Sequence, residues 1–94
     1  MAFFKAGNTD VPTATTRVQI SNTSEKIKCL AVKAPSVNAG RVFFGGSAVS
    51  AANGYSLDPG DALELDFGEG SVAFSTFYVD AAVSGDDVNW GVYF

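Results

Sequence analysis

The clearest pattern of hydrophobic and polar positions lies at residues 62–67, which read Ala-Leu-Glu-Leu-Asp-Phe. Apolar and acidic side chains alternate there, so a strand would turn the apolar ones toward a core and the two acids toward water. The last residues of the chain repeat this period of two, with apolar side chains at Val88, Trp90, Val92 and Phe94. We therefore predict strands over 62–67 and 88–94.

Several shorter segments are also rich in β-branched and aromatic residues and end at turn-forming residues: 17–20, 28–34, 42–44, a remnant at Val49, and 74–79. No segment combines the 3.6-residue apolar spacing of a helix with capping residues. The sequence therefore predicts an all-β fold, a small antiparallel β-sandwich or jelly-roll-like domain of about seven short strands. In its core we expect Trp90, packed among Val32, Val42, Leu63 and Leu65.

The middle of the sequence predicts two reversals of the chain. Pro35 ends the segment 28–34, and Asn-Ala-Gly at 38–40 tolerates the backbone of a tight turn. We predict a hairpin that pairs 28–34 with 42–44. The pair Pro59-Gly60 fits the second and third positions of a type II turn, with positive φ at the glycine.

The first sixteen residues have no apolar periodicity and read as an extended N-terminal arm at 1–16, ahead of a single β-sandwich domain at 17–94. Phe3 and Phe4 are the apolar residues that could anchor the arm, and Lys5 adds a charge suited to an acidic neighbour. We predict that these three residues bind a partner and that the arm lies across a neighbouring subunit or an underlying partner surface instead of folding onto its own sandwich.

Composition points to a subunit of an assembly. The chain has 94 residues, enough for one core, and charged residues make up only 17% of it. Soluble domains usually contain about 25% charged residues, so some apolar surface is expected to remain for a partner. We expect a homo-oligomer, a homotrimer around a surface axis, with more than about 1,000 Å² buried in its contacts.

Charge is divided unevenly along the chain. All six basic residues and two acids precede Val42, a balance of +4, and the other eight acids follow. If folding kept the two halves apart, copies could attract one another through complementary potentials. If a sandwich interleaved them, the asymmetry would vanish in space.

The residue types that carry chemistry are scarce. The chain has no histidine, and Cys29 is its single cysteine, so an internal disulfide and a cysteine-based zinc site are excluded. Asp80, Asp86 and Asp87 could offer oxygen ligands to Ca²⁺, but their spacing matches no EF-hand loop, and we interpret them as turn acids. We expect no enzyme, no catalytic residue, no cofactor and no metal site.

Two further partners are not expected. Nucleic-acid binding would need basic residues interleaved with exposed aromatics, whereas the aromatic-rich half of this chain is the acidic one. No segment approaches the roughly 18 consecutive apolar residues of a membrane span, and the start lacks the pattern of a signal peptide.

Several turn and strand motifs over residues 17–94 resemble a family of small tailed-bacteriophage virion proteins. The motifs are Cys29-x-x-Val32-Lys33-Ala34, Asn38-x-Gly40-x-Val42-Phe43, Gly45, Leu57-x-Pro59-Gly60-Asp61, Phe77-Tyr78-Val79 and Gly85-Asp86-Asp87-Val88. The resemblance carries over no catalytic or metal-binding residue.

The resemblance implies a virion structural protein made in the host cytoplasm. It favours a capsid decoration (cement) protein on the outer surface of the head, often a trimer, with the major capsid protein as its partner. A tail, baseplate or fibre adaptor is the alternative within the virion. A carbohydrate-binding β-sandwich, with Tyr55 or Tyr78 stacking on sugar rings, is a third hypothesis. A cupin-like enzyme is a fourth, and the missing histidines argue against its metal site.

Overall fold

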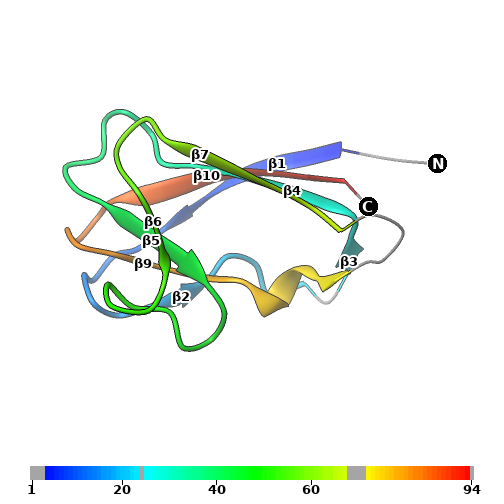
Figure 1. Cartoon of the computed structure of the whole chain (residues 1–94), viewed down its shortest axis with the longest axis horizontal. Coiled ribbons are helices and arrows are strands. Elements are labelled where there is room, and N and C mark those ends of the chain that lie inside the picture. Colours follow the sequence, from blue (N-terminus) through cyan, green and yellow to red (C-terminus); the bar gives the residue numbers. More distant parts are fainter. Residues whose placement is uncertain (1–3, 24, 68–71, 94) are drawn as a thin grey trace.

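The computed structural model describes residues 4–23, 25–67 and 72–93. These residues form two antiparallel sheets of four strands each, stacked as two layers (Figure 1). In hydrogen-bonded order, sheet A contains β1 (Phe4–Asp10), β10 (Asp87–Tyr93), β4 (Cys29–Lys33) and β7 (Ala62–Asp66). Sheet B contains β2 (Val18–Gln19), β9 (Tyr78–Ala81), β5 (Val42–Gly45) and β6 (Tyr55–Leu57). A short ladder joins β3 (Lys26–Ile27) to β8 (Val72–Ala73), which leads into the 3-10 turn η1 (Phe74–Thr76).

The chain crosses between the two sheets at almost every connection. Among the strands of sheets A and B, only β5 and β6 are consecutive and lie in the same sheet. Eight strands in two packed sheets with such crossings are a jelly roll. The predicted all-β class is confirmed, and the jelly-roll form of the prediction describes it better than a sandwich of hairpins.

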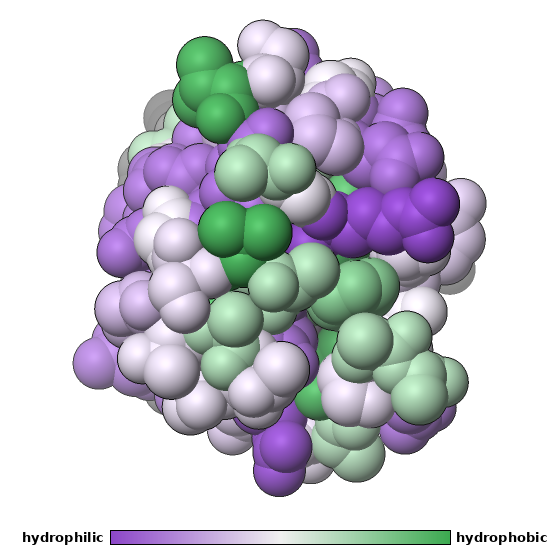
Figure 2. Space-filling model, turned by 90° about the vertical axis from the view of Figure 1, so that its left-hand side faces the viewer, coloured by the Kyte–Doolittle hydropathy of each residue, from purple (hydrophilic) through white to green (hydrophobic). Residues whose placement is uncertain are grey.

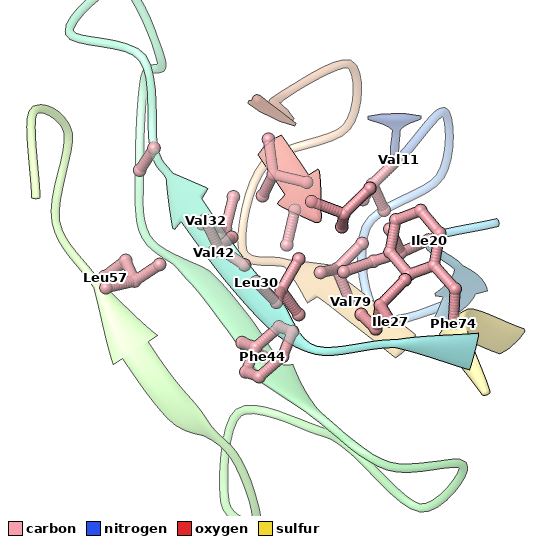
Figure 3. Close-up of a cluster of buried hydrophobic side chains, with 14 residues drawn as sticks. Val11, Ile20, Ile27, Leu30, Val32, Val42, Phe44, Leu57, Phe74 and Val79 are labelled. Atoms are coloured by element: carbon pink, nitrogen blue, oxygen red, sulfur yellow. The ribbon is translucent and has the colours of Figure 1, made fainter. Parts of the chain in front are cut away.

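The core lies between the sheets and takes side chains from both (Figure 3). Leu30 and Val32 from β4 meet Val42 and Phe44 from β5, and Phe74 closes one end beside Ile27. Fully burying one such side chain stabilises the fold by roughly 1.5–3 kcal/mol. The inward positions are those that the period of two predicted for β4 and β10.

The predicted hairpin between 28–34 and 42–44 is wrong. β4 pairs with β10 and β7 in sheet A, whereas β5 pairs with β6 and β9 in sheet B. The connection 34–41 therefore carries the chain from one sheet to the other. Turn residues signal that the chain reverses, but they do not determine which strand becomes the neighbour.

The reversal at Pro59-Gly60 is confirmed as a tight turn. The backbone amide of Asp61 donates to the carbonyl of Asp58 at 2.9 Å, and Gly60 has a φ of +94°. This turn also links two sheets, since β6 belongs to sheet B and β7 to sheet A.

The expected arm at 1–16 is corrected for residues 4–10, which form β1 and pair with β10 of the same chain from Phe4↔Tyr93 to Asp10↔Asp87. Without β1, β10 would be an open edge with unpaired backbone groups. Trp90 fixes this pairing: its Nε1 donates to Thr9 Oγ1 at 3.0 Å, and its ring lies over Gly7, where an added Cβ would come within 2.5 Å. Gly7 and Thr9 are thus the residues of β1 that accommodate the tryptophan.

Trp90 is less buried than the sequence predicted. The side chain is half-buried, contacts the core edge-on to Phe74 with 4.9 Å between ring centroids, and pairs across the ladder with Val32. The predicted strand 74–79 is displaced along the chain: η1 occupies its first three residues, and β9 begins at Tyr78 and ends at Ala81.

The two halves of the charge pattern interleave in sheet A. β1 and β4 come from the basic half, and they lie beside β10 and β7 from the acidic half. The described residues include no helix long and apolar enough to cross a membrane.

Candidate interaction surfaces

Three connections meet at one end of the sandwich, on the left in Figure 1, and we call them the loop platform: residues 11–17, 34–41 and 82–86. The first links β1 to β2, the second links β4 to β5, and the third links β9 to β10. Each of them therefore crosses from one sheet to the other. Hydrogen bonds join all three connections into one unit.

Asp86 is the centre of the loop platform. Its Oδ1 accepts from the backbone amide of Ala39 at 3.0 Å, and its Oδ2 accepts from that of Gly40 at 2.9 Å. The side chain is only 7% exposed, so these two amides replace the water that a carboxylate would otherwise bind. Gly40 suits this contact because a Cβ there would lie 2.9 Å from Val83 Cγ2.

Asn38 makes a second bridge between the connections. Its Nδ2 donates to the carbonyl of Asp87 at 2.8 Å, and its Oδ1 accepts from the amide of the same residue at 3.2 Å. An amide side chain that binds both backbone groups of one residue imitates a strand pairing. It fixes the connection 34–41 against the start of β10.

The connection 11–17 is held from the other side. The backbone amide of Val11 donates to the carbonyl of Asp86 at 2.9 Å, and the amide of Gly85 donates to the carbonyl of Val11 at 2.8 Å. The amide of Ala14 donates to Ser84 Oγ at 2.8 Å. The loop platform is therefore ordered by backbone and side-chain hydrogen bonds.

Apolar side chains stand on this ordered base. Val37 is 88% exposed and Val83 is 38% exposed, and the nearby Ala39 and Ala82 are exposed as well. Figure 2, which looks at this end, shows green hydrophobic residues in the middle of the face with purple hydrophilic ones to either side. Exposed apolar groups that need no reordering on contact are suited to binding another protein surface.

The outer face of sheet A is a second uncovered surface. Two rows of residues cross its four strands in register: Ala6, Gly91, Ala31, Glu64, and Asn8, Asn89, Lys33, Ala62. Four of these eight residues are alanine or glycine, and a shallow hollow of about 310 Å³ lies over the middle strands.

The residues predicted to bind a partner do not belong to either surface as a group. Phe3 lies outside the described residues. The backbone of Phe4 begins β1 and pairs with Tyr93 of β10. Lys5 is exposed on β1, where its backbone pairs with Val92. Sequence reasoning missed the loop platform because the residues that it joins are far apart in the chain: Ala39 and Asp86 are separated by 47 residues, and Ala14 and Ser84 by 70.

Two of the aspartates that could offer oxygen ligands to Ca²⁺ accept hydrogen bonds from backbone amides. Asp86 belongs to the platform, and Asp80 Oδ1 accepts from the amide of Ala81 at 2.8 Å. Within the described part of the chain, no group of three or more acidic or cysteine side chains is arranged to hold a metal ion. Cys29 is half-buried in β4, Tyr78 is half-buried, and Tyr55 is 59% exposed on β6.

Comparison with known proteins gives matches in structure. The fold is similar to that of a chain from the Bacillus endospore appendages, described as a family of disulfide-linked pili, with a TM-score of 0.51 and 17% identity over 99% of this chain and 87% of the other. It is also similar to the SPBc2 prophage-derived protein YomS, with a TM-score of 0.52 and 14% identity over 98% of this chain and 96% of the other. No family model and no curated protein matches the sequence. At these identities the likeness establishes a shared fold.

Proposed function

We propose that this chain is a non-enzymatic structural protein of a bacteriophage virion, namely a capsid decoration (cement) protein. It binds the outer surface of the head and stabilises contacts between subunits of the major capsid protein. The observation that carries this proposal is the loop platform, an ordered surface with Val37 and Val83 exposed at one end of the sandwich. The fold shared with a prophage-derived protein supports the phage setting.

The platform suits a lattice partner because each copy needs only a small contact. A surface built from three connections buries little area, which by itself gives weak binding. Copies that also contact one another would bind a repeating lattice with higher total affinity. The partners of the proposal are therefore the major capsid protein and further copies of this chain.

Particle binding tests the proposal directly. Val37→Asp places a charge on the platform and is expected to weaken cosedimentation with purified phage heads by at least about tenfold, because the carboxylate loses water on docking. Tyr55→Asp is the matched control, since Tyr55 is an exposed apolar residue on β6. It should bind heads as the unchanged protein does. Equal binding of the Val37 variant, or no binding of the unchanged protein to heads, would contradict the proposal.

A tail, fibre or pilus-like subunit is the second candidate, and the likeness to the endospore appendage chain favours it. A fibre linked end to end by disulfides needs two cysteines in each subunit, whereas these 94 residues contain one. Such a fibre would therefore be held by non-covalent contacts. Cosedimentation with purified tails instead of heads, or filaments of the isolated protein in electron micrographs, would favour this candidate.

A further inference from the structure

The outer face of sheet A is apolar at its centre and charged at its border. Ala6, Gly91 and Ala31 form the floor of the hollow across three adjacent strands. Lys33 and Glu64 stand on its rim, on the neighbouring strands β4 and β7. Both are exposed, and within the described residues neither forms an ion pair.

We infer that this face binds a second copy of the same chain, sheet against sheet, around a two-fold axis. The argument is charge complementarity. A two-fold axis presents the same patch on both partners, so a patch that carries one positive and one negative residue can satisfy itself. Lys33 of each copy then lies opposite Glu64 of the other, and the ion pair occurs twice.

The small residues make this approach possible. Packed sheets lie about 10 Å apart, a spacing that large side chains on both faces would prevent without interdigitation. With alanine and glycine in the middle, the two floors can approach until their borders meet. Tyr93, which is exposed two residues beyond Gly91 on β10, adds apolar area beside the hollow. The face is small, so the dimer is expected to be weak and to form at micromolar or higher concentrations.

Charge reversal tests the inference in solution, with the full chain and no phage particle. Sedimentation equilibrium is measured on the unchanged protein, on Lys33→Glu, on Glu64→Lys and on the double variant. Each single reversal places like charges opposite each other twice and is expected to weaken dimerisation at least about tenfold. The double variant restores both pairs and should dimerise within about threefold of the unchanged protein.

Mixing the two single variants gives a sharper result. A heterodimer of Lys33→Glu with Glu64→Lys has an opposite charge at both contacts, so the mixture should dimerise although neither variant does so alone. Lys26→Glu and Glu25→Lys are matched controls, because they change the net charge by the same amount at exposed positions that do not line the hollow. Both controls should dimerise as the unchanged protein does.

The inference is overturned if the protein stays monomeric at about 1 mM, if the single reversals have no effect, or if the mixture shows no rescue. A trimer that is insensitive to the reversals would overturn it as well. None of these outcomes touches the binding of heads through the loop platform, so the two proposals fail separately.

Discussion

The outer faces of the two sheets differ in what covers them. On sheet B, Phe43 faces away from the core between Val42 and Phe44, yet it is only 6% exposed. The connection 46–54 packs on this face: Val49 lies against Gly45, and Gly54 lies against Phe43. On sheet A the corresponding positions of β4 and β10 carry Ala31 and Gly91, and no connection among the described residues covers them.

The contrast shows that side-chain size decides whether the chain covers the outer face of a sheet with its own loop. A phenylalanine on the outer face would expose a large apolar ring, so the chain gains stability by folding its own loop over it. Alanine and glycine leave little apolar surface to cover, so sheet A is stable without a lid. A surface of this kind can take a partner without first displacing part of its own chain.

The largest expected effect is on the covered side. Phe43→Ala should lower the free energy of unfolding by about 3–5 kcal/mol, because it removes a buried ring that both β5 and the covering connection contact. Urea denaturation followed by tryptophan fluorescence measures the change. A loss below about 1 kcal/mol would mean that the covering connection contributes little, and the contrast between the two faces would disappear.

The buried carboxylate of Asp86 in the loop platform should contribute nearly as much to the free energy of unfolding. Asp86→Ala removes the acceptor of two amide hydrogen bonds and is expected to cost about 2–4 kcal/mol in the same experiment. Asp86→Asn keeps one acceptor oxygen and should cost less. If the alanine variant unfolded at the same urea concentration as the unchanged protein, the buried carboxylate would not be what orders the platform.

Two glycines of the covering connection provide a matched pair. A Cβ at Gly54 would lie 2.6 Å from Val49 Cγ2 and 3.0 Å from the Ser50 carbonyl oxygen, whereas a Cβ at Gly46 would have no atom within 4 Å. Gly54→Ala should therefore cost about 1–3 kcal/mol through overpacking. Gly46→Ala should be neutral or slightly stabilising, because it only restricts the unfolded chain. Equal effects of the two substitutions would show that the connection is not packed on the sheet.

Local alternation predicted the strands well where one face is buried. The period of two over 62–67 located β7, and that over 88–94 located β10, because each inward side chain lies two residues from the next. Apolar residues lie on both faces of 28–34, a pattern typical of a central strand, and β4 is a central strand of sheet A.

Pairing and covering could not be predicted in the same way. β4 and β5 look like a hairpin in sequence, but a jelly roll sends them to different sheets. β1 was missed because Gly7, which no strand propensity favours, is selected by the ring of Trp90 more than eighty residues later. The loop platform depends on Asp86 reaching Ala39 and Gly40, a contact that no local pattern encodes.

The smallest expected effect is on the uncovered side. Glu64→Gln removes a charge from the rim of the hollow, where the side chain is exposed and has no ion-pair partner within the described residues. At low protein concentration, where the chain is monomeric, the free energy of unfolding should change by less than about 0.5 kcal/mol.

At high concentration the unchanged protein should melt at a higher temperature than when dilute, because association stabilises the folded state by mass action. The Glu64 variant should show a smaller rise, since a neutral amide replaces one member of both ion pairs. A variant that loses stability when dilute would show that Glu64 serves its own sheet, and the uncovered face would then be part of the fold instead of a surface left for a second copy.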